Sequence, residues 1–63
     1  KPYKEFNLIV GLRIREIRET FNMTRDEFSE KCDISASFLA DVENGKKSIS
    51  SRTFYKICSS TTV

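Results

Sequence analysis

Residues 24–45, Thr-Arg-Asp-Glu-Phe-Ser-Glu-Lys-Cys-Asp-Ile-Ser-Ala-Ser-Phe-Leu-Ala-Asp-Val-Glu-Asn-Gly, decide the fold of this chain. Apolar residues recur in this stretch at the spacing of two short helices that cross at a steep angle. These residues are Phe28, Cys32, Ile34, Leu39 and Val42. Ser29 is expected where the helices approach most closely, since a side chain larger than Ala or Ser would push them apart. The stretch predicts two helices joined by a tight turn over about residues 24–43.

Local signals define the ends of these two helices. Thr24, followed three residues later by Glu27, forms a capping box that starts the first helix. Ser35 can cap the second helix in the same way. Asp33 occupies the turn position that needs a left-handed backbone, where Gly is easiest and Asn or Asp are tolerated next. We therefore predict a positive φ at Asp33.

Helices are also predicted on both sides of this unit. Before it, an apolar stripe of helical period indicates a helix from about Phe6 to Phe21, with Asn22 at its C-cap. After it, Gly45 reverses the chain, and a last helix carries Phe54, Ile57 and Cys58. The fold class is thus all-α, a compact bundle of four short helices, or of five if a further helix is missing or cut short. The residues of the stripe are Phe6, Val10, Ile14, Ile17 and Phe21.

Length and composition fit one small domain. A chain of 63 residues buries only about 60% of the surface that it exposes when extended. We expect a flexible N-terminal arm over residues 1–5, a folded domain over 6–59 and a truncated or frayed end over 60–63 of a longer protein. No apolar run approaches the roughly 20 residues of a membrane span. The 11 basic and 9 acidic residues, net +2 with pI near 8.7, permit a polyanionic partner without requiring one.

Residue usage argues against a metal site and against catalysis. Cys32 and Cys58 fall on apolar helical positions and no secretory signal is present, so we expect reduced, buried thiols and a cytoplasmic location. The chain has no His, so two Cys would need carboxylates to complete a zinc site, and neither metal nor cofactor is expected. The carboxylates are spaced as exposed helix charges, with no Gly-rich phosphate loop or nucleophile elbow. We expect no enzyme and no small-molecule substrate.

Several short motifs in one order carry a family resemblance. Together they make the chain resemble the lambda-repressor/Cro-type helix-turn-helix DNA-binding domains over roughly residues 10–58. The resemblance implies an all-α bundle of four or five helices with the helix-turn-helix at about residues 24–43. The motifs are Gly11-Leu12-Arg13-Ile14-Arg15-Glu16-Ile17-Arg18, Thr24 to Ser29, Ile34-Ser35, Val42-Glu43-Asn44-Gly45-Lys46 and Thr53-Phe54-Tyr55-Lys56-Ile57.

The resemblance also implies an ion pair between Arg18 and Glu43, which would tie the first helix to the end of the second helix of the unit. If the pair is buried, removing one partner costs about 3–5 kcal/mol, because the other charge is left uncompensated. The alternative is two solvated charges worth about 0–1 kcal/mol.

By resemblance, the chain is the DNA-binding domain of a bacterial or phage transcriptional regulator that reads double-stranded DNA. A recognition helix over about Ser35–Glu43 would enter the major groove. Ser35, Ala36, Ser37 and Asp41 match the base-reading positions. Ala36 can only contact a thymine methyl and Ser37 offers one hydroxyl, so direct readout is expected to be shallow. Asp41 could accept from cytosine, or it could be an ordinary solvated helix charge.

Contacts to phosphates are better supplied. Arg25, Asn44, Lys46 and Lys47 are the candidates, around the backbone N–H groups that begin each helix of the unit. Arg25 replaces a Gln common in the family, and with it the usual buttress of the recognition helix, so Arg25 is expected to clamp a phosphate. For Lys46 and Lys47 the alternative is an ordinary solvated loop.

A competing interpretation is a protein-interaction module that keeps the scaffold without reading DNA, as the short side chains at the reading positions and Asp41 would suit. Homodimerisation, through segments outside this chain or on DNA, is compatible with a DNA reader of two half-sites about 34 Å apart. Salt separates the alternatives, because each phosphate contact adds about −0.9 to the slope of log K against log salt.

Overall fold

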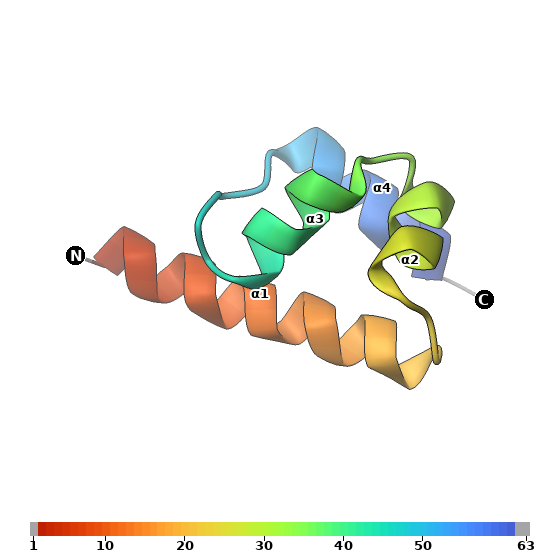
Figure 1. Ribbon diagram of the computed structural model, residues 1–63. Helices are drawn as coiled ribbons and strands as arrows, with labels where there is room; N and C mark the ends of the chain where they lie inside the picture. The colour runs from red at the N-terminus through yellow and green to blue at the C-terminus, as the bar shows by residue number, and fades with distance from the viewer. Residues whose placement is uncertain (1, 62–63) are drawn as a thin grey trace.

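The computed structural model describes the backbone of residues 2–61 and the side chains of residues 4–61, and it folds into four helices without strands in that part of the chain. The helices are α1 (Pro2–Thr20), α2 (Arg25–Cys32), α3 (Ala36–Glu43) and α4 (Ser51–Thr61). The long α1 lies along one side, and the three shorter helices pack together on the other (Figure 1). The predicted all-α class is confirmed.

Helix α1 starts earlier than the sequence suggested. It begins at Pro2, whose fixed φ suits the first helical position, and Glu5 lies in the first turn, where a carboxylate interacts favourably with the helix dipole. Residues 2–5, predicted as an arm, are therefore helical, and Lys1 lies outside the described residues. At the other end Asn22 has a left-handed backbone with φ of 56°, as suits its predicted place at the C-cap.

Helix α4 also extends further than expected. The end predicted to be frayed over residues 60–63 includes Ser60 and Thr61, which are helical. The Ser60 hydroxyl donates to the carbonyl oxygen of Lys31 over 3.1 Å, and the Thr61 hydroxyl donates to that of Ile57 over 3.1 Å. The first of these bonds ties α4 to α2. Residues 62–63 lie outside the described part.

The local signals of the central unit are confirmed. Both hydrogen bonds of the capping box are formed, from the N–H of Glu27 to Thr24 Oγ1 over 3.1 Å and from the N–H of Thr24 to Glu27 Oε1 over 2.9 Å. Ser35 caps α3 by accepting from the N–H of Phe38 over 3.0 Å. Asp33 has φ of 59°, in the left-handed region.

The core lies where α1, α2, α3 and α4 meet. Its centre comprises the predicted Phe28 and Leu39, both fully buried, while Ile34 is half-buried at its edge. Two ends of the α1 stripe are not core residues, since Phe6 is 64% and Phe21 40% exposed. The eight-residue α3 is too short to cover the whole of a 19-residue helix. The buried apolar residues are Ile14, Phe28, Cys32, Leu39, Val42 and Ile57.

The prediction of a buried thiol is correct for Cys32 and wrong for Cys58. Burial raises the pKa of the Cys32 thiol. Cys58 is exposed, because Ile57 occupies the inward face of α4 and the next residue is rotated by about 100° around the helix.

Glycine lets α1 approach the end of α3. A Cβ on Gly11 would lie 2.8 Å from the carbonyl oxygen of Glu43 and would also collide with that of Val42. Gly45 follows in the left-handed region, with φ of 75°, and its α-carbon faces Leu8. The backbone of α1 therefore lies directly against the C-terminal turn of α3, which brings the arginines of α1 within reach of Glu43.

Candidate nucleic-acid interface

Helix α3 presents one edge to the core and the other to solvent. Leu39 and Val42 are buried on the inner edge, while Ser35 and Ser37 are exposed and Ala36 is half-buried. The Ser35 oxygen already accepts the capping bond from the N–H of Phe38, so its hydroxyl remains able to donate. The exposed edge thus offers a short, mainly hydroxyl and methyl surface at the start of the helix.

Two candidates of different predicted roles lie against each other. Lys47 Nζ is 3.5 Å from Asp41 Oδ2 and 5.8 Å from the centre of the Phe38 ring. Asp41 is half-buried, and Lys47 keeps more than half of its side chain exposed. The lysine therefore screens the carboxylate on this side of α3, which lowers the cost of bringing Asp41 near a phosphate.

Glu43, at the end of α3, is the most strongly held charge in the described residues. Its side chain is buried and receives the Nε of Arg18 at 2.7 Å on Oε2 and the Nη2 of Arg18 at 3.2 Å on Oε1. Arg18 also donates through Nη1 to the carbonyl oxygen of Met23 over 2.9 Å, and 12% of its side chain is exposed. The ion pair implied by the resemblance is therefore present in its buried form.

The carboxylate of Glu43 is shared by three arginines. The Nε of Arg25, from α2, donates to Glu43 Oε1 over 3.0 Å, and the Nε of Arg15, from α1, lies 3.6 Å from the same oxygen. Burial alone would raise the pKa of Glu43, but hydrogen bonds from Arg18 and Arg25 outweigh burial and lower it. The hydrogen bond to Glu43 raises the pKa of Arg18. Both shifts favour the charged forms of Glu43 and Arg18.

Arg25 contacts α3, which its sequence position did not predict. Arg25 stands where the family commonly has a Gln that supports the recognition helix, and it was therefore expected to lose that support and to bind a phosphate. In the structure it does support α3, because it donates to Glu43. With 39% of its side chain exposed, its outer face is still open to an anion. Contact with Glu43 and contact with a phosphate are compatible, because a guanidinium group carries five donors in a fork.

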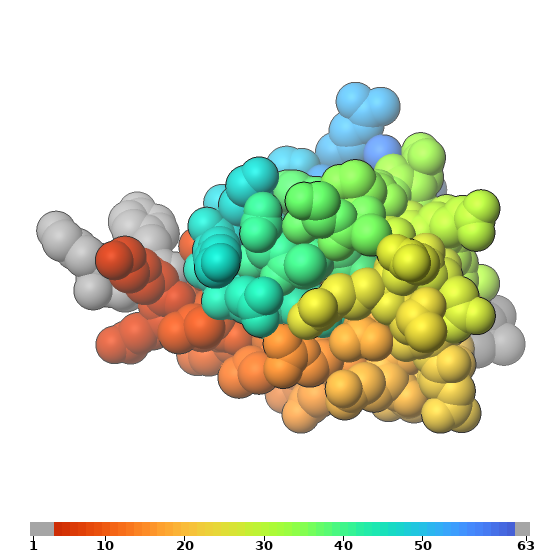
Figure 2. Space-filling view, in the orientation of Figure 1, coloured from red at the N-terminus to blue at the C-terminus, as the bar shows by residue number. Residues whose placement is uncertain are grey.

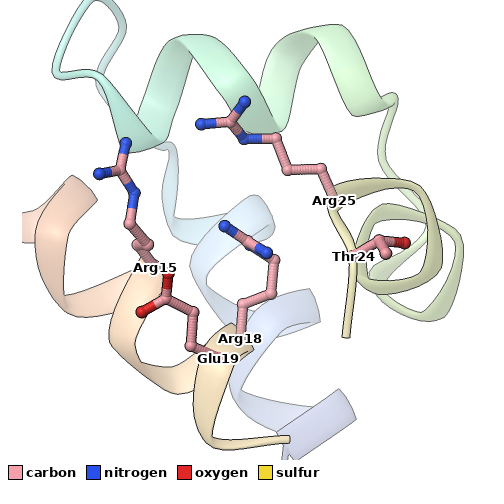
Figure 3. A pocket seen from close by; sticks show the side chains of 5 residues that line it. All are labelled: Arg15, Arg18, Glu19, Thr24 and Arg25. Carbon is pink, nitrogen blue, oxygen red and sulfur yellow. The ribbon is translucent and has the colours of Figure 1, made fainter. Parts of the chain in front are cut away.

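Arg15 was missed as a site residue. Its Nη2 donates to Asn44 Oδ1 over 3.1 Å, so it holds one of the predicted phosphate candidates. Its position three residues before Arg18 on the same helix places both side chains on one face, which was the available clue. Arg15, Arg18 and Arg25 rise from α1 and α2 around a shallow hollow whose lining also includes Glu19 and Thr24 (Figure 3).

Parts of three helices meet on one face. In Figure 2 the middle of α1, the start of α2 and the C-terminal part of α3 lie side by side on the face turned to the viewer. Lys46, in the loop after α3, is exposed.

No helix among residues 2–61 is long and apolar enough to cross a membrane, and no group of three or more potential metal ligands occurs there.

A family model described as helix-turn-helix matches residues 14–61, three quarters of the chain and all of α2, α3 and α4. The chain belongs to the Cro/lambda-repressor-type helix-turn-helix family. Searches of curated proteins and of solved structures find no match. The family is one of DNA-binding domains and not of enzymes, and in its terms α2 and α3 are the two helices of the motif.

Proposed function

We propose that this helix-turn-helix domain binds double-stranded DNA in a sequence-specific manner, as the DNA-binding domain of a cytoplasmic transcriptional regulator of a bacterium or phage. Helix α3 enters the major groove, with its exposed N-terminal edge toward the base pairs. The observation that carries this proposal is the one-sided anchoring of α3, whose inner edge is buried while Ser35 and Ser37 are exposed.

Base readout rests on few groups. The Ser37 hydroxyl is a single donor or acceptor, and the Ala36 methyl suits a thymine methyl. Asp41 accepts from a cytosine amino group once Lys47, which holds it at 3.5 Å, turns toward a phosphate. The expected operator therefore has a small number of strongly preferred base pairs.

Phosphates supply much of the affinity. The proposed contacts come from Arg25 at the start of α2, whose guanidinium lies against Glu43, and from Asn44, Lys46 and Lys47 after α3, so they gather around the C-terminal end of α3. Phosphate contacts fix the register of the helix on the duplex, and base contacts then discriminate. Homodimers that form on DNA would place two such domains on half-sites about 34 Å apart.

Selection from a randomised duplex library tests the proposal. Anisotropy titrations of the winning duplex and of a scrambled one, at several salt concentrations, should show tighter binding of the winner and a steep salt slope for both. Ser37→Glu should abolish the preference, and Lys46→Glu should weaken both duplexes alike. Absence of enrichment together with salt-independent behaviour would refute DNA reading.

A second candidate function, a protein-interaction module, is favoured by one observation. An apolar hollow of about 250 Å³ lies between α1 and α4, lined among others by Ile9, Ile17 and Phe54. Ile9 is 63% and Phe54 56% exposed. Under this alternative the library selection fails, and Ile9→Asp disrupts binding of a protein partner.

A further inference from the structure

We infer that Arg15 and Arg25 together form a seat for one phosphodiester of the DNA backbone, organised by Glu43 beneath them. The inference rests on the proposed DNA-binding function and deepens it. It adds a residue of α1, Arg15, to the interface, and it gives Arg25 and Arg15 one shared ligand. Both side chains line the same hollow (Figure 3).

The two guanidinium groups are neighbours. Their Nε atoms lie 3.0 Å and 3.6 Å from the same oxygen, Glu43 Oε1, although they come from different helices. Of the arginines on Glu43, Arg18 is the most enclosed, with 12% of its side chain exposed, whereas Arg25 is 39% and Arg15 33% exposed. The two outer arginines can therefore reach an external anion while the inner one fixes the carboxylate.

The charges around the hollow fit a singly charged anion. Three arginines face the buried Glu43 carboxylate and the exposed Glu19 at the rim, which leaves a surplus of one positive charge. A phosphodiester carries one negative charge. Arginine forks bind phosphate oxygens through two parallel N–H bonds, and two adjacent forks can hold both non-bridging oxygens.

Arg15 has donors to spare. Its Nε is buried and has no hydrogen-bond partner among the described residues, and its bond to Asn44 uses a single Nη2 hydrogen. A buried donor without an acceptor is unfavourable, so a shift of this guanidinium toward a strong acceptor is favourable. The start of α2, whose residues Thr24 and Arg25 line the hollow, adds a positive helix end beside the same position.

Salt dependence measures the seat directly. The selected duplex and a scrambled duplex are titrated with wild type, Arg15→Gln and Arg13→Gln, all checked for folding by circular dichroism. Arg13 is a matched control because it lies on the same helix and is 75% exposed, but it lines the separate apolar hollow between α1 and α4. Arg15→Gln should reduce the salt slope by about 0.9 on both duplexes, whereas Arg13→Gln leaves it unchanged. Between about 50 and about 200 mM salt, wild type then loses about 3.5-fold more affinity than Arg15→Gln.

Neutral methylphosphonate links identify the contacted phosphate with the folded wild-type protein. At one substituted position the loss of affinity should be clearly smaller for Arg15→Gln than for wild type, because the Arg15 contact is already lost and only Arg25 still holds that phosphate. If every position weakens both proteins equally, or if the slope of Arg15→Gln equals that of Arg13→Gln, the seat is refuted while DNA binding stands. If wild type shows no salt-dependent binding, the proposed function fails and the seat falls with it. If Arg15→Gln does not fold, Arg15→Lys replaces it in both measurements. The loss of affinity at each methylphosphonate position must then differ between Arg15→Lys and wild type at one position, and identical losses at all positions refute the seat.

Discussion

Removing Glu43 is expected to destabilise the fold more than removing Arg18, although the two form one ion pair. Glu43→Gln leaves the enclosed Arg18 without its counter-charge, beside Arg25 and Arg15. Leaving a buried charge uncompensated in this way costs about 3–5 kcal/mol. Arg18→Met instead leaves Glu43 with Arg25 at 3.0 Å and Arg15 at 3.6 Å, so its carboxylate stays compensated.

The cost of Arg18→Met is then the loss of charge-assisted hydrogen bonds, about 1.5–3 kcal/mol. A domain of 63 residues is typically stable by about 3–9 kcal/mol, so Glu43→Gln removes a large share of that stability. Urea unfolding followed by the helical circular dichroism signal at pH 7 gives both values, provided that the slope against urea is unchanged.

The exposed pair Arg13–Glu16 supplies the control for this comparison. Their side chains are 75% and 68% exposed, so Glu16→Gln should change stability by less than about 0.5 kcal/mol. An Arg18→Met variant that is as destabilised as Glu43→Gln, or more so, would refute the reasoning, because it would mean that Arg15 and Arg25 do not compensate the carboxylate.

Further variants test other parts of the fold and the interface. Gly11→Ala, which would gain about 1 kcal/mol in an ordinary helix, should instead lose about 1–3 kcal/mol in urea unfolding, since its Cβ meets the carbonyl oxygen of Glu43. Asp33→Ala should cost about 1–2 kcal/mol at φ of 59° and Asp33→Gly should not, a difference that thermal melts resolve. Because the pKa of Glu43 is lowered in the folded state, its stabilisation is complete above the unfolded value of about 4.3 and is lost as the pH falls through the folded value. The stability difference between wild type and Glu43→Gln should therefore shrink on acidification below about pH 4. Asp41→Asn should raise affinity for scrambled duplex about 1.4- to 5-fold in anisotropy, because it releases Lys47 from a partly exposed pair worth about 0.2–1 kcal/mol.

The central unit could be predicted in detail because its determinants are local. The Thr24–Glu27 capping box, the Ser35 cap and the left-handed Asp33 each depend on residues within one turn of the chain. Such signals are readable without knowing how the helices pack. The length of α1 could not be predicted in this way, because Pro2 is compatible both with an extended arm and with the start of a helix.

Interactions between helices were only partly predictable. The Arg18–Glu43 pair came from the family resemblance, but the arrival of Arg15 and Arg25 at the same carboxylate depends on how closely α1 approaches α3. Gly11 permits that close approach, and no periodic pattern in the sequence reveals that a glycine is needed there. Exposure of Phe6 likewise follows from the short length of α3, a tertiary property, and the apolar stripe alone overstates the core.

The short side chains of α3 determine how the proposed base contacts and phosphate contacts would share the work of DNA recognition. If Ala36 and Ser37 face the base pairs as proposed, base contacts are few and short, so a small error in the placement of α3 would remove them all. Placement therefore has to come from phosphate contacts that are rigid. Glu43 provides that rigidity, because it ties arginines of α1 and α2 to the end of the helix that they must position. Under the proposed function, the same carboxylate lowers the positive charge available to DNA, so the site would exchange some affinity for a fixed geometry, which is the more useful property where base contacts are weak.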